Sequence, residues 1–396
     1  MRAKKWNVWV GCSFAVMLAA PLVACSKKYT YKENAVPETV ALSPRLKNLF
    51  KETKLVCFGR YALTVPKEAQ VIWGEVSFPT RIDLFQGSRE VITELVSKDI
   101  EKIRRADETA EITYNNPGPI ENSWQFRYYD SEEAKELNLH FFNTYINKGD
   151  LIFLLGGSVE KGQTEDQAAA QEASRAKSLR LRTEDDVPSE EGYCIEHGFM
   201  ASSFYGNQEM VAVGIHLPSL PDVTFSISSN KDAYSDYPKK EFARMKVEEL
   251  SLLARIRQAQ EQQGSNYPDR TLLREGKRDV QHWHGEESLI RRPDGTHDFE
   301  WGFVGTPKDV ANPPEFGAAM FTKVEHNTVG AAKAASLSDD EAVALWDKLL
   351  SGLKFRVKVP GAPEGSYYMP PRRTDAASKA NNVRSAISTR GQTGQT

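Results

Sequence analysis

The sequence lacks the short motifs that mark the common catalytic sites. It contains no G-x-S-x-G, the signature of a serine nucleophile on a sharp strand-to-helix turn. It contains neither the phosphate-binding G-x-x-x-x-G-K-[ST] nor the zinc-binding H-E-x-x-H. The usual evidence for a serine hydrolase, a nucleotide-binding protein or a metalloprotease is therefore missing, and we expect no catalytic residues and no cofactor.

An excess of positive charge is missing as well. Lys and Arg total 51 and Asp and Glu total 54, which gives a formal net charge of −3. Surfaces that bind nucleic acid are strongly basic, because they must neutralise phosphates. The composition therefore argues against a nucleic-acid partner.

Charge is absent altogether from one stretch near the start. Residues 6–24 carry no charged side chain and follow a basic head, which is typical of a signal peptide. The stretch closes with LVAC, residues 22–25, which resembles the lipobox of bacterial lipoproteins. That resemblance implies removal of residues 1–24, a lipid on Cys25 and a periplasmic location, with the outer membrane favoured because Ser26 is not an aspartate. An uncleaved membrane-spanning helix is the alternative.

Cysteine is scarce, with four in the chain. Cys12 lies in the leader and Cys25 is the expected lipid site, so Cys57 and Cys194 remain. Two cysteines in an oxidising compartment favour a disulfide. Two buried free thiols are the alternative, because the sequence does not give the distance between the two Cα atoms.

The rest of the chain shows the same order of elements twice. In the first half, three strands, a helix, four further strands and a polar helix near residues 164–179 follow one another. The strand patterns lie at 55–58, 61–66, 71–78, 110–116, 123–130, 139–146 and 150–157. We expect Ser88 to cap the first helix, which places these apolar residues on one face: Ile92, Leu95, Val96, Ile100 and Ile103.

The second half repeats this plan with longer helices. Strand patterns occur at 192–202, 209–218 and 222–229, and three or more strands are expected between Ser288 and Glu325. One helix is predicted over 238–262, with Ala243, Val247, Leu250 and Ala254 on its apolar face. A capping box, Ser338 with Glu341, predicts the start of the last helix.

The predicted fold class is α+β, with two domains of similar plan, each an antiparallel sheet covered by helices, and a disordered tail. The acidic stretch RTEDDVPSEE reads as a linker. The tail is rich in Pro, Gly, Ser, Thr and Asn, a composition that cannot bury a core. The expected segments are a signal peptide 1–24, a lipidated tether 25–46, an N-terminal domain 47–181, a linker 182–191, a C-terminal domain 192–357 and a tail 358–396.

One cluster suggests a metal site. It consists of His282, His284, Glu286, Glu287, His297 and Asp298. On a strand, His282 and His284 would share a face and could bind one zinc ion. The alternative is a solvated turn at Gly285, with Trp283 buried between two exposed histidines. The turn is favoured because no third ligand lies at close spacing, so we expect no metal.

A family resemblance rests on strand sequences. CFGRYALTVPKEAQVIWG, residues 57–74, resembles the amino-terminal domain of immunity proteins paired with type VI secretion lipase effectors, in the group cognate to the fourth class of those lipases. EGYCIEHGFMAS and HLPSLPDVTFSISSN resemble the opening of that family's carboxy-terminal domain. HGEESLIRRPDGTHDFEWGFVG resembles its Gly-Glu-Glu turn and Phe-x-Trp strand. The resemblance covers about residues 47–357.

This resemblance implies a function without catalysis. The protein would bind and inhibit a cognate secreted phospholipase in the periplasm, held at the membrane by its lipid. We expect the two domains to clamp the lipase, with residues 182–191 as a hinge. Two alternatives stay open: a zinc-dependent envelope hydrolase centred on His282, His284 and His297, and a structural envelope lipoprotein.

Overall fold

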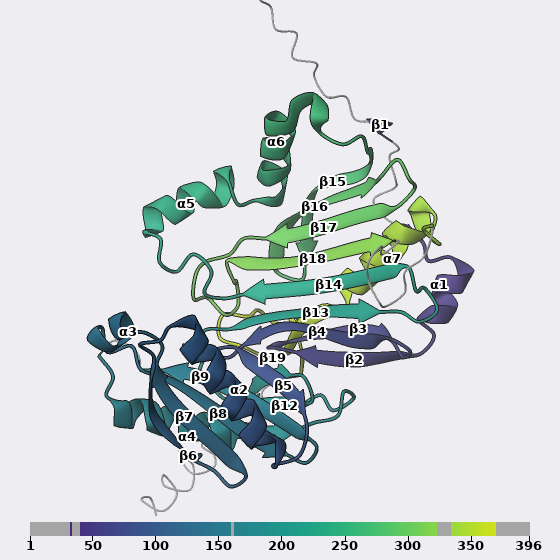
Figure 1. Ribbon diagram of the computed structural model, residues 1–396. Coiled ribbons are helices and arrows are strands. Elements are labelled where there is room, and N and C mark those ends of the chain that lie inside the picture. Colours follow the sequence, from purple (N-terminus) through teal and green to yellow (C-terminus); the bar gives the residue numbers. More distant parts are fainter. Residues whose placement is uncertain (1–31, 34–39, 160–161, 323–333, 370–396) are drawn as a thin grey trace, which may run out of the picture.

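The protein is described by a computed structural model over residues 32–33, 40–159, 162–322 and 334–369. The leader, Cys25 and residues 370–396 lie outside the described residues. The strands form four sheets with helices packed against them, so the predicted α+β class is confirmed (Figure 1). No helix of the described part is both long and apolar enough to cross a membrane.

The largest sheet has eight strands, antiparallel except for the parallel pairing of its first two. Their order is β1 (Lys32–Glu33), β15 (Thr271–Val280), β16 (Trp283–Arg291), β17 (His297–Phe303), β18 (Glu315–Thr322), β14 (Val223–Asn230), β13 (Met210–His216) and β4 (Gln70–Ser77).

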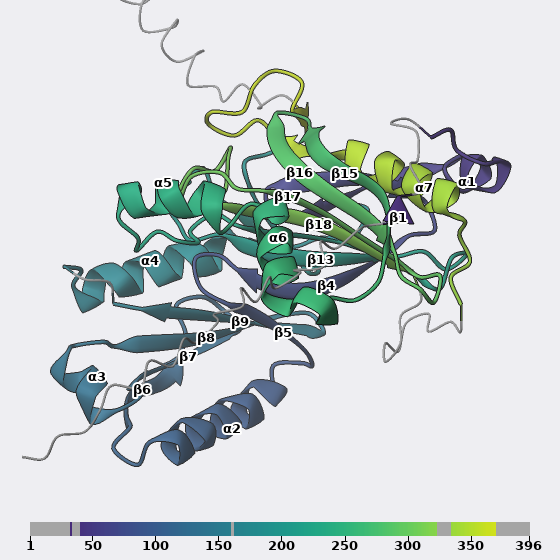
Figure 2. The ribbon, with the colours of Figure 1, turned by 90° about the horizontal axis from the view of Figure 1, so that it is seen from above.

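A five-stranded antiparallel sheet follows β4 along the chain. Its order is β5 (Ile82–Gln86), β9 (Leu151–Ser158), β8 (Phe141–Lys148), β7 (Ser123–Tyr129) and β6 (Glu111–Pro117). Helices α2 (Val91–Ala106) and α4 (Glu165–Ser178) lie on opposite sides of this sheet (Figure 2). The short helix α3 (Glu132–Glu136) connects β7 to β8.

Two small sheets join the large ones. One has the order β2 (Thr53–Phe58), β3 (Tyr61–Pro66), β19 (Leu353–Val357) and β20 (Tyr367–Met369), and the other has the order β10 (Leu179–Leu181), β12 (Gly198–Ala201) and β11 (Gly192–Ile195). The remaining helices are α1 (Pro44–Leu49), α5 (Lys239–Glu248), α6 (Leu252–Gln263), the 3-10 turn Gly264–Asn266 and α7 (Asp339–Ser351).

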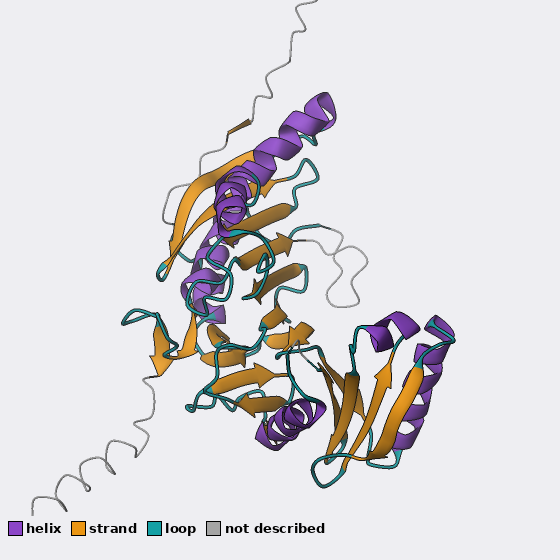
Figure 3. Ribbon diagram, turned by 90° about the vertical axis from the view of Figure 1, so that its left-hand side faces the viewer, coloured by secondary structure: helices purple, strands orange, loops and turns teal. Residues whose placement is uncertain are grey.

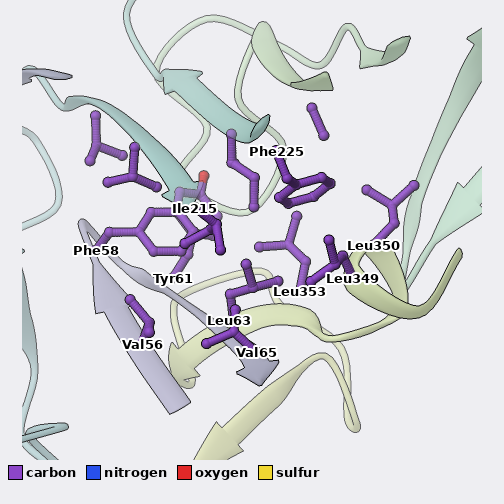
Figure 4. Packing of buried hydrophobic residues seen from close by; sticks show 14 of the residues in the cluster. Val56, Phe58, Tyr61, Leu63, Val65, Ile215, Phe225, Leu349, Leu350 and Leu353 are labelled. Atoms are coloured by element: carbon purple, nitrogen blue, oxygen red, sulfur yellow. The ribbon is translucent and has the colours of Figure 1, made fainter. Parts of the chain in front are cut away.

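The sheets do not follow the two halves of the sequence. Strand β3, which pairs with β2, also pairs with β19 from the end of the chain, and β4 pairs with β13. Figure 4 shows the result: side chains of β2 and β3 pack against those of β13, β14 and α7 in one core. Tyr61 is representative, since its ring stacks on Phe316 and Phe355 and its hydroxyl lies 3.0 Å from Ser229 Oγ. The domain boundaries on either side of 182–191 stay a prediction.

The last helix begins where its capping box predicts. Ser338 accepts a hydrogen bond from the backbone N–H of Glu341, and the Glu341 side chain accepts one from the N–H of Ser338. Glu341 also accepts hydrogen bonds from Arg45 in α1, and this contact lowers the pKa of Glu341 to about 2. The capping box therefore also fastens α1 to α7.

The predicted helix starts and lengths were wrong at two places. Helix α2 begins at Val91 with Glu90 at its cap. The Ser88 hydroxyl donates to the Glu90 carboxylate, and no side chain at the cap accepts a hydrogen bond from the helix. The helix predicted over 238–262 is two helices, since Ser251 accepts from the N–H of Ala254 and starts α6 anew. Val247, predicted to be buried, is 70% exposed on α5.

The strand predictions near the histidines and the start of the tail also need correction. Two strands, β15 and β16, begin before Ser288, and Gly285, Glu286 and Glu287 lie within β16 and not in a turn. The folded part continues past residue 358 to Met369, because β20 pairs with β19 and Tyr368 donates a hydrogen bond to the carbonyl of Gly352. At the other end, Val40 and Leu42 of the predicted tether pack against the core.

Candidate functional site

Three buried arginines hold the junction between the two small sheets. Arg60, between β2 and β3, is 2% exposed and donates to Glu209, which is also buried, at 2.6 Å. It also donates to the carbonyl oxygens of residues 192, 202 and 204, and its guanidinium lies 4.5 Å from the ring centroid of Tyr205. A charge this deeply buried is tolerated because nearly every donor has a partner.

The other two arginines fix the segment predicted as a hinge. Arg182 donates to the carbonyls of Cys57, Ile195 and Gly198, and Arg356 donates to those of residues 188, 190 and 192. Burial lowers the pKa of both to about 10, so both are charged at neutral pH. That residues 182–191 act as a hinge stays a prediction, and hydrogen bonds from Arg182 and Arg356 attach this segment to neighbouring strands.

Cys57 and Cys194 lie at the same junction. Their Cα atoms are 5.9 Å apart, the sulfurs are bonded in the structure, and both side chains are fully buried. Next to the bond, Gly59 and Cys194 exchange backbone hydrogen bonds of 2.8 and 2.9 Å. The two residues thus connect β2 to β11 across 137 positions of sequence.

The histidine cluster is dispersed among separate partners. His282 Nε2 lies 3.0 Å from the carbonyl oxygen of Ala311, and His284, on the surface, lies 3.0 Å from Asp279. His297 is buried against Thr322 and Asp339, and burial lowers its pKa.

The acidic members of the cluster also have partners of their own. Glu286 accepts from the N–H of Leu253, Glu287 from Arg274 and Trp346, and Asp298 from Arg292. In the part of the chain that the structure describes, no three His, Cys, Asp or Glu side chains are grouped to hold a metal ion.

One face of the eight-stranded sheet is open over β13, β14 and β18, whereas α6 contacts β16 and β17 on the same side. Helix α7 packs on its inner face, where the ring of Trp346 contacts Phe225 and Phe299. The outward residues at the middle of β13, β14 and β18 are short. One row across the three strands consists of Gly214, Ser226 and Ala319, and the next row consists of Ala212, Ser228 and Gly317. Figure 1 shows these three strands from this side, with no described helix drawn across them.

Large apolar side chains stand out from this smooth face. Ile72 on β4, opposite Gly214, is 41% exposed, and Phe321 on β18, opposite Thr224, is 36% exposed. The five-stranded sheet diverges from the eight-stranded sheet at the β4–β5 connection (Figure 3). Just after α3, which connects two of its strands, Leu137 and Leu139 are also exposed. We call these four residues and the outward face of β4, β13, β14 and β18 the open surface.

Sequence reasoning found part of this site. The alternation in β14 predicted one buried and one polar face, and the polar face is part of the open surface. It missed that β4 and β18 extend the same face, because strand pairing between distant segments leaves no local signal. Arg182 was predicted to lie in a linker. Its position directly after Leu181, at the end of an apolar stretch, was a signal in the sequence for a buried arginine.

The chain matches two protein-family models over most of its length. Residues 54–186 match "Tle cognate immunity protein 4 N-terminal domain", and residues 186–358 match "Tle cognate immunity protein 4 C-terminal domain". A search of curated proteins found no significant match.

Solved structures share the fold. The immunity protein TplEi of the T6SS from Pseudomonas aeruginosa, complexed with "L" peptide, is 22% identical with a TM-score of 0.57, and the match covers 77% of this chain and 98% of that one. The apo form of TplEi is 21% identical with a TM-score of 0.59, and the match covers 77% of this chain and 97% of that one. A chain of a Tle4–Tli4 complex is 23% identical with a TM-score of 0.59, and the match covers 77% of this chain and 98% of that one. At these identities the similarity shows the fold.

Proposed function

Because the chain belongs to the Tle cognate immunity protein 4 family, as the sequence resemblance implied, we propose that it binds and inhibits a type VI secreted phospholipase. Proteins of this family confer immunity and are not enzymes. One solved relative is in a complex named Tle4–Tli4, which supports direct binding as the means of inhibition. The open surface is the observation that supports a binding site on this chain.

The open surface has the features of a protein-binding site. Exposed apolar side chains such as Ile72, Phe321 and Leu137 gain about 25 cal/mol for each Å² that a partner removes from water. The short side chains between them leave the backbone accessible, so a partner can approach the sheet closely. The five-stranded and eight-stranded sheets diverge from each other, so one partner can contact both.

A fixed junction favours tight binding. Ordering flexible parts on association costs free energy, and a preorganised surface avoids that cost. The buried arginines and the bond between β2 and β11 hold the two small sheets in one arrangement before the partner arrives. We therefore propose a preformed clamp in place of one that closes about residues 182–191.

Phe321→Asp tests the open surface. We expect about 30-fold weaker binding to the lipase encoded beside this gene, corresponding to about 2 kcal/mol, because the change removes an apolar contact and buries a charge. Binding would be measured by calorimetry, together with residual phospholipase activity at equimolar ratio. Leu181→Asp is the matched control, since Leu181 is 44% exposed on β10 in a different sheet. Equal effects of the two substitutions would argue against this surface.

We also propose that the protein acts from the periplasmic side of the envelope as a lipoprotein. The basic head, the uncharged stretch and LVAC support this, and all three lie outside the described residues. Cys25→Ser should abolish incorporation of a labelled fatty acid and move the protein from the membrane fraction to the soluble fraction. Retention of label in that variant would show that Cys25 does not carry the lipid.

The two alternative functions have less support. A zinc hydrolase needs a common ligand set, whereas His282, His284 and His297 each contact different groups. A structural envelope lipoprotein would leave the activity of the cognate lipase unchanged in the equimolar assay, which distinguishes it from an immunity protein.

A further inference from the structure

A groove runs beside α2 at one end of the five-stranded sheet. It consists of two adjoining cavities of about 680 and 490 Å³ that share Asp99, Lys102, Tyr128 and Asn143. The first cavity also reaches Thr80 and the last residues of β9. Strand β5 begins, β9 ends, β8 begins and β7 ends here, so this is the end of the sheet that adjoins the β4–β5 connection. We call it the α2 groove.

The lining of the α2 groove combines apolar groups with aromatic rings. Phe85, Tyr128, Phe141 and Leu154 belong to it. Tyr128 packs against Phe126 at a ring-centroid distance of 5.4 Å and against Phe141 at 5.5 Å. Phe126 is buried beneath the groove, and the rings of Tyr128 and Phe141 form a continuous surface on which a planar cation can stack.

Carboxylates outnumber cations around these rings. Asp83 is paired with Arg81 at 2.7 Å, which leaves Asp99, Asp107 and Asp130 against Lys102 among the charged lining residues. Tyr145 donates a hydrogen bond to Asp99 and so fixes that carboxylate. Burial and the negative charges of Asp130 and Asp99 raise the pKa of Tyr128 to about 12, as expected for a negative potential inside the groove.

We propose that the α2 groove receives an arginine- or lysine-bearing segment of the effector. This inference rests on the proposed function and specifies the chemistry of the partner. A guanidinium can stack on Tyr128 or Phe141 while donating to Asp99 and Asp130, which matches the mixture of rings and carboxylates found here. An apolar segment would leave these carboxylates without solvent or a partner, which is costly.

Two further observations favour the effector as the occupant. The groove adjoins the open surface, because it lies at the β4–β5 connection and includes Asp130 and Ser131, next to α3 and the exposed Leu137 and Leu139. The chain before residue 370 carries all of the net negative charge, since the tail has five basic residues and one acid. A basic segment on the effector would therefore be attracted to this protein during association.

The double variant Asp99→Asn with Asp130→Asn tests the inference, because asparagine keeps the size and the hydrogen-bond acceptor of each residue. We expect about tenfold weaker binding of the lipase at low salt, through slower association, with the difference shrinking as salt rises. Asp279→Asn with Glu364→Gln is the control, since it removes two exposed charges outside the groove. Urea unfolding of each variant checks that the fold is intact.

The outcomes are distinguishable. Binding of the Asp99 and Asp130 variant equal to that of the control variant at low salt would overturn the inference. A second outcome would also overturn the inference. If a chain ending at Met369 binds the lipase more tightly, and the two substitutions no longer weaken its binding, the groove is occupied by the protein's own basic tail. A wild-type protein that does not bind the lipase would overturn the proposed function, and this inference with it.

Discussion

Replacing Cys57 and Cys194 by alanine is expected to lower the free energy of unfolding by about 3–5 kcal/mol. The bond closes a loop of 137 positions, and a covalent link across so long a loop strongly restricts the unfolded chain. The sulfurs are fully buried among Phe199 and Val187, so the bond also fills space in a packed region. Urea unfolding of the protein beginning at Ser26, followed by fluorescence, measures the change.

Reduction of the wild-type protein provides the control. In the presence of a thiol reductant its unfolding midpoint should fall to that of the double alanine variant, while the variant itself should not respond. A wild-type midpoint unaffected by reductant under conditions that unfold the protein would show that the bond does not form in solution, leaving two buried thiols.

The substitution Arg60→Met is expected to cost a similar amount, about 3–5 kcal/mol, because it leaves the Glu209 carboxylate buried without its cation. Glu209 is 5% exposed and accepts from Arg60 through both carboxylate oxygens. The rings of Phe78, Tyr193 and Tyr205 lie around the guanidinium, with centroids 4.5–5.7 Å from it. Thermal and urea unfolding would both show the loss, and lipase binding would weaken if the junction positions the open surface.

A second variant separates the cost of a buried, unpaired Glu209 carboxylate from the cost of lost packing at Arg60. Arg60→Met combined with Glu209→Leu should be more stable than Arg60→Met alone, because no carboxylate remains buried without a partner. Costs that simply add in the double variant would mean that the two side chains do not act as a pair.

The sequence predicted those parts of the fold that depend on neighbouring residues. The alternation of Val223, Phe225 and Ile227 located β14 and its buried face, and Ser338 with Glu341 located the start of α7. The apolar face of α2 was also correct, since Ile92 and Val96 are buried and Leu95, Ile100 and Ile103 pack beside them. Each of these patterns repeats with the period of its own element.

The sequence could not predict which strands pair across the molecule. Nothing near Ile72 indicates that β4 joins β13, and nothing near Leu353 indicates that β19 joins β3. The open surface depends on these pairings, as do the carbonyl partners of Arg60, Arg182 and Arg356. The family resemblance indicated the function, but only the arrangement in space shows which side chains are free to contact a partner.

The exchange of strands between the halves also constrains how such proteins can diversify. The two family matches meet at residue 186, which suggests an obvious crossover point for recombination between relatives. After a crossover there, the paired strands β4 and β13 would come from different parent proteins, and so would the paired strands β3 and β19. New partner specificity would therefore arise more readily by substitutions on the outward face of one intact sheet than by shuffling of whole halves.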